Sequence, residues 1–203
     1  VKGEGCWVTD IDGNRLLDGM AGLWYKAAGY GRREIADAVY EQMTAIESPP
    51  APGTVVSTVE LSGKVASLYP DNDARIFFVS GGSEAVEASI KLARQYFLEI
   101  GQPKRHRVIA RRQSYHGNTL GALAAGGNAW RRTQFAPLLA DTTHISPCYE
   151  YRDRQDGETQ EAYGLRVANE LETEILRLGP DTVMAFLAEP VVGATSGAVP
   201  AVP

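Results

Sequence analysis

The chain has 203 residues, of which 44% are hydrophobic and 22% charged, a balance that is typical of globular proteins and argues against disorder. Its 20 Lys and Arg against 25 Asp and Glu give a net charge of -5, which provides no electrostatic reason to expect a nucleic acid or an anionic membrane as partner. We therefore expect its partners to be small molecules.

Cysteine usage leads us to expect a cytoplasmic protein. Cys6 and Cys148 stand far apart with no CxxC pattern, so they are expected to be free thiols in a reducing compartment. No apolar run reaches the roughly 18 residues that a membrane span requires. The first residues lack the regions of a signal peptide and do not begin with Met, which suggests a truncated piece.

The first fifty residues predict a β-hairpin, a glycine-rich loop and a surface helix. Residues 7–11 alternate in polarity, meet the turn signal Asp12-Gly13-Asn14 and resume at residues 15–17. Glycines then break any regular period, leaving Trp24 on a loop where aromatic side chains could line a pocket. Helical spacing of apolar residues follows over residues 33–46.

A Pro/Gly break then separates two parts of the sequence. Pro49-Pro50 and Pro52-Gly53 end the surface helix, and another helix is expected from residues 55 to 68. The break near residue 53 is the predicted domain boundary, dividing residues 1–53 from residues 54–203.

From residue 75 onward, short apolar runs alternate with segments of helical length. The expected strands are residues 76–79, 108–110, 142–145 and 183–187, and the expected helices are about residues 83–99, 118–125 and 160–178. Such alternation predicts an α/β fold, with a mostly parallel sheet that helices cover on both faces.

The segment FFVSGGSEA predicts an anion site where an apolar strand runs through Gly81 and Gly82 into a helix. The start of a helix leaves backbone N–H groups unpaired, glycine lets a phosphate approach the backbone, and Ser83 adds a hydroxyl donor. A plain strand-to-helix turn remains the alternative for this segment taken alone. Neither of the common nucleotide-phosphate motifs, GxxxxGK[ST] and GxGxxG after a strand, occurs in the chain.

The segment SYHGNT follows the strand at 108–110, at the end of a parallel strand where such sheets place ligands. The flat ring of Tyr115 could stack on a planar cofactor, whereas His116 is either a hydrogen-bonded turn residue or part of the site. No GxSxG motif supports a serine hydrolase, and the histidines and cysteines show no metal-ligand spacing.

A third candidate is Glu189, which ends the most apolar strand of the chain. A carboxylate at that position could bond a ligand hydroxyl or a nearby basic group, and a solvated strand end is the alternative.

In this order, the segments resemble the class III (ω-) aminotransferases of the pyridoxal-phosphate (PLP) fold-type I superfamily, over essentially the whole chain. The motifs that carry the resemblance are LLDGMAGLW, GYGRREIADA, FFVSGGSEAVEASIKLAR, SYHGNT and AEPVVGA. The resemblance implies that residues 54–203 are the first part of the large PLP-binding domain. It also implies that residues 1–53 are the hairpin and helix segment of the small domain.

By the same resemblance, six residues would contact or surround PLP, and Trp24 would line the substrate pocket. Gly81, Gly82 and Ser83 would bind the phosphate, Tyr115 would stack on the pyridine ring with His116 beside it, and Glu189 would belong to the polar network near the ring. Family members commonly have Ser at the position of Gly81. Several ω-amino-acid enzymes have Glu at the position of Ala194, so its absence favours the amine:pyruvate branch.

The resemblance places the remaining catalytic residues beyond Pro203. In the family, an Asp pairs with the pyridinium nitrogen and a Lys forms the Schiff base, but no lysine of this chain occupies a matching context. Lys91, for example, follows Glu87 by four residues and is interpreted as part of a surface ion pair.

The resemblance therefore implies a homodimeric transaminase that moves an amino group from an amine or ω-amino acid to an α-keto acid such as pyruvate. This chain alone would be inactive, because the lysine is missing. The alternatives left open are an aminomutase or decarboxylase on the same scaffold, and a non-catalytic fragment.

Overall fold

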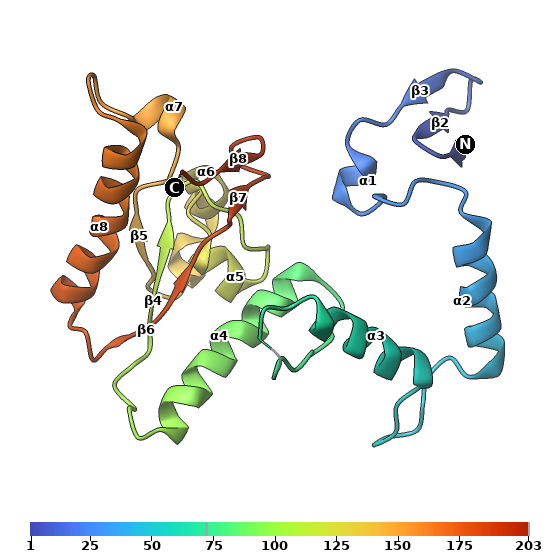
Figure 1. The fold of residues 1–203 in the computed structure, drawn as a ribbon, viewed down its shortest axis with the longest axis horizontal. Coiled ribbons are helices and arrows are strands. Elements are labelled where there is room, and N and C mark those ends of the chain that lie inside the picture. Colours follow the sequence, from blue (N-terminus) through green and yellow to red (C-terminus); the bar gives the residue numbers. More distant parts are fainter. Residues whose placement is uncertain (72, 203) are drawn as a thin grey trace. The chain divides into compact units, whose positions relative to one another are not determined.

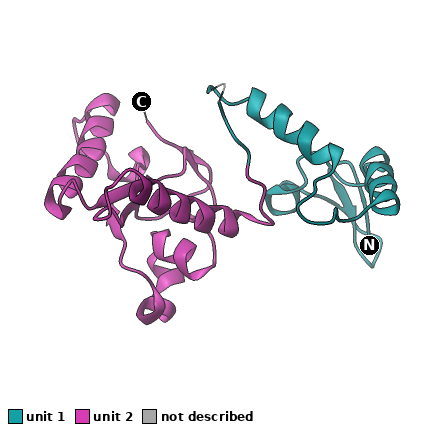
Figure 2. Cartoon of the chain, turned by 90° about the horizontal axis from the view of Figure 1, so that it is seen from below, with its two compact units in different colours: residues 1–76 teal, residues 77–203 magenta. Residues whose placement is uncertain are grey.

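The computed structural model describes residues 1–71 and 73–202 and divides the chain into two compact units, Val1–Ile76 and Phe77–Pro203 (Figures 1 and 2). The division lies after the Pro52-Gly53 break at which the sequence predicts a domain boundary. The assignment of residues 1–53 and 54–203 to two domains of a complete protein stays a prediction.

The first unit contains the expected hairpin and both expected helices. Its antiparallel sheet has the order β1-β2-β3, and the Asp10 carboxylate closes the β2–β3 turn by accepting hydrogen bonds from the amides of Asp12 (2.9 Å) and Asn14 (2.8 Å). The elements are β1 (Lys2–Glu4), β2 (Trp7–Thr9), β3 (Arg15–Leu17), the single turn α1 (Ala21–Trp24), α2 (Arg33–Ala45) and α3 (Val56–Ser67). The hairpin pairs Trp7 with Leu17, which confirms the prediction.

The helices α2 and α3 leave their apolar stripes uncovered. Both helices lie wholly within the described residues, and none of their residues is buried. On α2, Ile35, Val39 and Met43 are at least half exposed. Such a row of apolar side chains on one face of a helix is a surface built to pack against another element.

The second unit is built on a three-stranded parallel sheet with the order β5-β4-β6. The strands are β4 (Arg107–Arg111), β5 (Thr143–Ile145) and β6 (Val183–Leu187), followed by the antiparallel pair β7 (Val191–Val192) and β8 (Val199–Pro200). The helices are α4 (Gly82–Glu99), α5 (Leu120–Ala125), α6 (Ala129–Arg132), the 3₁₀ helix η1 (Thr133–Leu138), α7 (Glu150–Asp153) and α8 (Gln160–Leu178). Three predicted strands and all predicted helices are therefore confirmed.

The central strand β4 is buried on both of its faces. Ile109 packs with Ile145 and Val183 against an apolar row of α8 formed by Leu171, Ile175 and Leu178. The neighbouring residues Val108 and Ala110 point to the opposite face, as alternation in a strand requires, and are also buried. Figure 1 shows α8 on one side of the sheet and α5 on the other.

The strand predicted at residues 76–79 is wrong for this structure. In the described chain these residues form no strand, and Phe77 and Phe78 are 79% and 44% exposed. An apolar sequence becomes a strand only where another strand supplies hydrogen-bond partners, and the described parallel sheet consists of β5, β4 and β6 alone. The segment instead leads into α4 without regular secondary structure.

The short helix α5 has a charged group of the favourable sign at each end. The Glu87 carboxylate of α4 accepts hydrogen bonds from the amides of Gly121 (2.9 Å) and Ala122 (3.1 Å). Arg132 donates to carbonyl oxygens at the other end, those of Leu123, Ala124 and Gly126. Both contacts satisfy orphan backbone groups and oppose the helix dipole.

The surface ion pair predicted between Glu87 and Lys91 is not formed, since the salt bridges of the described residues do not include it. The Glu87 carboxylate is drawn instead to the start of α5, where two backbone amides are fixed donors. The two amides are held in place by the backbone, whereas the Lys91 ammonium is flexible and is also solvated by water. The amides are therefore the better partners for the Glu87 carboxylate.

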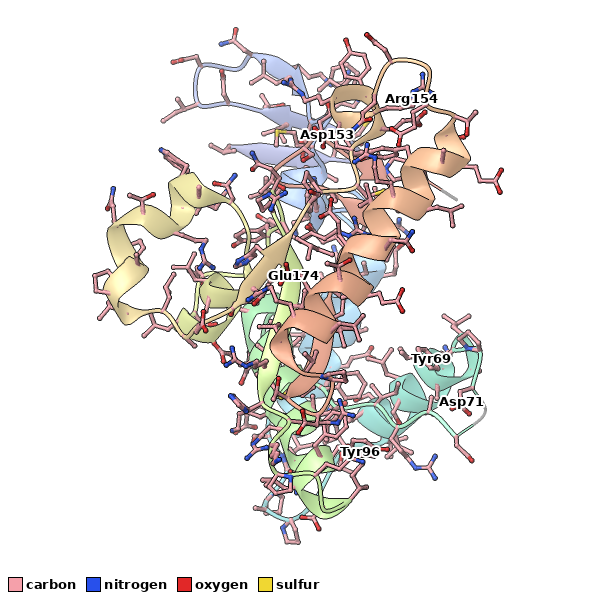
Figure 3. All side chains as sticks on the ribbon, turned by 90° about the vertical axis from the view of Figure 1, so that its left-hand side faces the viewer. Tyr69, Asp71, Tyr96, Asp153, Arg154 and Glu174 are labelled. Atoms are coloured by element: carbon pink, nitrogen blue, oxygen red, sulfur yellow. The ribbon has the colours of Figure 1, made fainter. Side chains whose placement is uncertain are left out.

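Tyr163 of α8 anchors the segment that follows β5. The ring is fully buried beside Cys148 and Val167, and its hydroxyl accepts a hydrogen bond from the Tyr149 amide at 2.7 Å. The Tyr163 hydroxyl therefore joins α8 to the loop that links β5 with α7. Figure 3 labels Asp153, which ends α7, and Glu174 in the second half of α8.

Length and composition of the helices bear on membrane insertion. Among residues 1–71 and 73–202, no helix combines the length and the apolar character needed to cross a bilayer.

Replacing Tyr163 by Phe should lower the free energy of unfolding by about 1–2 kcal/mol, because the part-buried Tyr149 amide loses its acceptor. Burial raises the pKa of Tyr163 from 10.0 to about 12, so the hydroxyl stabilises the fold below pH 10 and this contribution is lost as the pH rises towards 12. Denaturant unfolding at several pH values measures both effects. The 89% exposed Tyr151, changed to Phe, is the control and should have no effect.

Replacing Glu87 by Gln should destabilise the protein by about 0.5–1.5 kcal/mol at neutral pH, because a neutral amide interacts less well with the start of α5. Hydrogen bonds from Thr119 and from the amides of Ala122 and Gly121 lower the pKa of Glu87 below 4.5. The difference between wild type and variant should therefore persist above pH 4.5 and disappear as the pH falls through the lowered pKa. Glu99→Gln, at the exposed end of α4, should behave as wild type throughout.

Candidate functional site

The start of α4 offers free backbone amides to open space. Gly81 is extended, and the first helical hydrogen bond runs from the Ala85 amide to the Gly81 carbonyl at 3.0 Å. The amides of residues 82–84 precede that bond, so the helix itself gives them no acceptor. Around the positions that a Cβ of Gly81 or Gly82 would take, no atom lies within 4 Å. An anion can therefore approach this end of the helix from outside.

The turn that carries Tyr115 and His116 lies directly against this helix start. The Ser83 hydroxyl accepts a hydrogen bond from the Asn118 amide (3.1 Å) and lies 3.2 Å from Asn118 Oδ1, to which it donates. Gly117 has a φ of +133°, and a Cβ there would lie 2.8 Å from the Cα of Ser83. Both the backbone conformation and the close approach therefore require glycine.

The Ser83 hydroxyl is already committed to Asn118, which the sequence did not predict. Because its proton goes to Asn118 Oδ1, the donors that face the open space at the helix start are the backbone amides. Asn118 belongs to the SYHGNT segment, but nothing in its residue type alone distinguishes this partner from an ordinary turn residue.

Glu189 fixes the turn from the side of the sheet. It follows β6 by two residues, and its Oε2 accepts a hydrogen bond from the Tyr115 amide at 3.1 Å. A second link comes from the loop between β7 and β8, where the Thr195 hydroxyl donates to the Gln113 carbonyl. The turn is thus attached to α4 on one side and to the segments after β6 on the other.

One face of the Tyr115 ring is covered by Arg131, with the guanidinium carbon 4.8 Å from the ring centroid. Arg131 lies on α6, whose start is capped by the Asn128 side chain, and Asn128 also donates to the Gln113 side chain at 3.1 Å. Arginine on an aromatic face is a favourable cation–π arrangement that restricts the ring. Sequence reasoning missed this residue because α6 carries no clear helical period.

His116 has an unused polar atom in the interior. Its Nε2 is buried and finds no hydrogen-bond partner among the residues that the structure describes. Burial lowers the pKa of His116 and the nearby Glu189 charge opposes that shift, so the ring is neutral at neutral pH. A buried polar atom without a partner is costly, and a bound group that supplies one would remove the cost.

Six of the predicted site residues therefore lie in one connected region of the second unit. Contacts run from Gly81, Gly82 and Ser83 through the Asn118 turn to Tyr115 and His116, and from there to Glu189. Trp24, the seventh, belongs to the first unit and its predicted role stays a prediction.

The residues present fit a planar ring that bears a phosphate. Open space beside Gly81 and Gly82 adjoins unpaired amides, which suits the anion. The Tyr115 ring and the partnerless Nε2 of His116 are attached to the same turn that contacts the helix start, which suits a ring joined to that anion.

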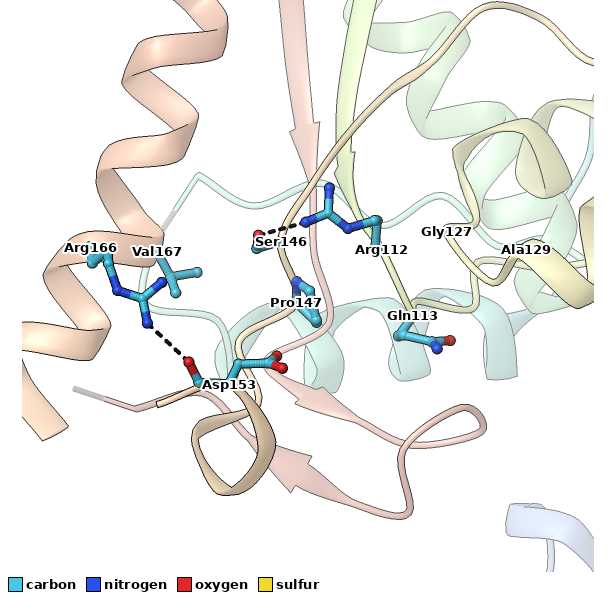
Figure 4. Close-up of a pocket in the computed structure, with 9 residues that line it drawn as sticks. All are labelled: Arg112, Gln113, Gly127, Ala129, Ser146, Pro147, Asp153, Arg166 and Val167. Atoms are coloured by element: carbon cyan, nitrogen blue, oxygen red, sulfur yellow. Dashed lines mark hydrogen bonds between the residues drawn. The ribbon is translucent and has the colours of Figure 1, made fainter. Parts of the chain in front are cut away.

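A cavity of about 470 Å³ lies elsewhere, near the ends of β4 and β5 (Figure 4). Its cations are already engaged: Arg112 donates to the Ser146 hydroxyl at 2.6 Å, and Arg166 forms an ion pair with Glu158 at 2.7 Å. Because both guanidinium groups already have hydrogen-bond acceptors within the chain, the cavity offers less for a ligand to bind than the start of α4.

Metal-binding groups do not gather in the described part of the chain. Within residues 1–71 and 73–202, no three His, Cys, Asp or Glu side chains lie together as metal ligands would.

Comparison with known proteins gives consistent matches over the whole chain. The class-III aminotransferase family model matches residues 1–203. An uncharacterized aminotransferase of Schizosaccharomyces pombe is 42% identical over 205 residues, covering 100% of this chain and 45% of that protein. The putrescine–pyruvate aminotransferase of Pseudomonas aeruginosa is 35% identical over 208 residues, covering 98% of this chain and 44% of that protein. This chain therefore spans less than half the length of these relatives.

A solved structure agrees with these matches. The omega transaminase of Pseudomonas jessenii in complex with pyridoxamine phosphate (PMP) has a TM-score of 0.94 at 30% identity, covering 99% of this chain and 45% of that one. The mixed α/β fold, with its small parallel sheet and antiparallel strands, thus matches part of the fold of an omega transaminase. With a family model that matches every residue, this chain belongs to the class III aminotransferases.

Proposed function

We propose that this chain is the N-terminal part of a PLP-dependent transaminase, which moves an amino group from an amine or ω-amino acid to an α-keto acid such as pyruvate. The observation that carries the proposal is the close approach of Gly117 to Ser83, which joins an anion-binding helix start to an aromatic turn. Support comes from the Pseudomonas aeruginosa relative, which is named a putrescine–pyruvate aminotransferase, and from the PMP-bound relative.

The phosphate would lie at the start of α4. The amides of Gly82 and Ser83 would donate to its oxygens, and the positive end of the helix dipole would favour its charge. Gly81 leaves the space in which the phosphate would fit. Because the Ser83 hydroxyl is bonded to Asn118, its main part would be to align the helix start with the turn.

The pyridine ring would lie against Tyr115. Arg131 covers one face of the Tyr115 ring, so the cofactor would stack on the other face, with His116 beside it. The contact of Glu189 with the Tyr115 amide keeps the stacking residue in register with the sheet. These residues bind and orient the ring, and none of them needs to move a proton.

When bound, PLP delocalises the electrons left behind as a proton leaves the substrate carbon. The Lys that takes up that proton, and the Asp that faces the ring nitrogen, are expected beyond Pro203. This chain would therefore supply the binding half of the site, and catalysis would require the longer polypeptide.

The same proposal gives the finer architecture. Residues 54–203 would be the first part of a fold-type I large domain, whose sheet gains strands from the rest of the polypeptide. The apolar segment 77–79, with its exposed Phe77 and Phe78, would then become a strand beside one of them. A cytoplasmic homodimer, in which the exposed stripes of α2 and α3 are covered, completes the proposal.

Binding of PMP tests the proposal directly. The longer polypeptide that contains this sequence, freed of cofactor, should bind PMP much more tightly than pyridoxamine or inorganic phosphate alone, as measured by absorbance and calorimetry. When pyruvate is then added to the PMP-loaded protein, it should be converted to alanine while PMP is converted to PLP. Absence of PMP binding would remove the assignment, whereas a product whose amino group has moved within one molecule, or released carbon dioxide, would show an aminomutase or a decarboxylase.

Replacing Gly117 by Ala should weaken PMP binding by more than about tenfold, because the new methyl group pushes the turn away from Ser83. The matched control is Gly101→Ala, since Gly101 also has a positive φ (+73°) but no atom lies within 4 Å of its Cβ position. Both variants should lose some stability through backbone strain, but only Gly117→Ala should lose cofactor affinity. Equal affinity losses in the two would show that the close approach is irrelevant to the site.

Replacing Tyr115 by Leu should weaken PMP binding by roughly five- to tenfold through loss of ring stacking, while Tyr115→Phe should bind nearly as wild type. Neither change removes the backbone amide that Glu189 accepts from, so the turn should stay in place. Calorimetric titration with PMP measures the effect. Inorganic phosphate, which lacks a ring, should bind all three proteins alike, and a loss there would point to a displaced turn instead.

A further inference from the structure

The glycine-rich loop of the first unit contains a run of backbone in the left-handed region. Ala21, Gly22, Leu23 and Trp24 have φ values of 49°, 60°, 66° and 76°. The turn they form, α1, is closed by a hydrogen bond of 2.9 Å from the Trp24 amide to the Met20 carbonyl. Three of these four residues carry a side chain.

Such a run is unfavourable unless the surroundings enforce it. A left-handed turn brings each Cβ close to the following carbonyl, so residues other than glycine adopt it singly and rarely in succession. Backbone strain of this kind persists only where neighbouring contacts determine it, and it gathers at functional sites.

Asp18 supplies the first set of contacts. Its Oδ1 accepts a hydrogen bond from the Met20 amide (2.9 Å), and its Oδ2 accepts one from the Gly22 amide (2.6 Å). The Asp18 amide itself donates to the Cys6 carbonyl at 2.9 Å, which ties the carboxylate to the sheet. Asp18 therefore binds two backbone groups at the start of the turn and fixes their direction.

Tyr30 supplies the second set. Its hydroxyl donates to Asp18 Oδ2 at 2.7 Å, and this hydrogen bond lowers the pKa of Asp18, so the carboxylate stays charged at neutral pH. The Tyr30 backbone exchanges two hydrogen bonds with Gly5, at 3.0 and 2.7 Å. A Cβ on Gly3 would lie 2.7 Å from the Cβ of Tyr30, so the ring rests on β1.

The turn presents large apolar side chains to the outside. Leu23 and Trp24 are 67% and 62% exposed, and the neighbouring Met20 and Tyr25 are also exposed. A loop that only faces solvent does not require a strained backbone, which costs free energy. The strained turn does, however, give the exposed Trp24 indole a defined position. The left-handed turn, held by Asp18 and Tyr30, therefore determines where the Trp24 side chain lies.

We infer that Asp18 and Tyr30 are positioning residues, which hold the left-handed turn in place and thereby set how large an amine donor can fit beside Trp24. This inference rests on the proposed function, in which Trp24 lines the substrate pocket. It assigns no contact with the substrate to Asp18 or Tyr30, since both act through the backbone of the turn.

The first test measures the turn without any catalysis. In the longer polypeptide, Asp18→Asn and Tyr30→Phe should speed amide hydrogen exchange at residues 22–26 by about tenfold, and leave exchange in β4 and α8 unchanged. Leu23→Gly should restore much of the protection in the Asp18→Asn background, because glycine adopts positive φ readily. Ala27→Gly in the same background should restore nothing, since Ala27 does not have a positive φ.

The second test measures specificity. For both variants, the ratio of kcat/KM for a bulky amine to that for a small amine should rise about tenfold, through KM for the bulky donor and with little change in kcat. PMP affinity should stay at the wild-type value. Leu23→Gly in the Asp18→Asn background should return the ratio towards wild type, which a merely destabilised protein would not show.

The outcomes separate the inference from the function on which it rests. If wild type transfers no amino group while hydrogen exchange changes as expected, the proposed function fails and the holding role of Asp18 and Tyr30 survives. If wild type is active and either the exchange rates or the donor ratio stay unchanged in the variants, the inference is overturned and the proposed function stands.

Discussion

The contact between Gly117 and the start of α4 is the constraint on which the candidate site depends. At this point two segments far apart in the sequence approach so closely that a single methyl group would not fit between them. Ser83 and Asn118 complete the junction with two reciprocal hydrogen bonds. The junction thereby holds the free amides at the start of α4 against the turn that carries Tyr115, and in the proposed function one phosphate-bearing cofactor would contact both. Glu189 and Arg131 then fix the aromatic residue from two further sides.

Two charged side chains stabilise the helix that follows this junction. Glu87 and Arg132 come from α4 and α6 and meet opposite ends of α5, the helix that continues directly from the aromatic turn. A six-residue helix has little stability of its own, because most of its backbone groups lie within a turn of one end. Charged groups of the right sign at both ends compensate for that shortness. The two units of the chain thus use related means, since a carboxylate that accepts backbone amides also secures the left-handed turn around Trp24.

Several apolar surfaces of the described chain have no other element packed against them. The central strand β4 is buried on both faces, whereas α2, α3 and the segment around Phe77 leave apolar side chains in the open. Apolar surface of this extent is a favourable place for more polypeptide to pack. The relatives, of which this chain covers less than half, are consistent with that interpretation.

Local signals in the sequence determined the hairpin at Asp12-Gly13, the helices α2, α3, α4, α5 and α8, the three parallel strands and the family, because periodicity, turn chemistry and ordered motifs depend on near neighbours in the chain. They also singled out six of the residues that the second unit brings into one region. Only the tertiary structure decided that Ser83 bonds Asn118, that Arg131 covers Tyr115 and that Glu87 turns from Lys91 to α5, since each contact joins segments whose spacing in the sequence carries no signal. The same holds for residues 76–79, whose composition suits a strand but whose state depends on a neighbour to pair with.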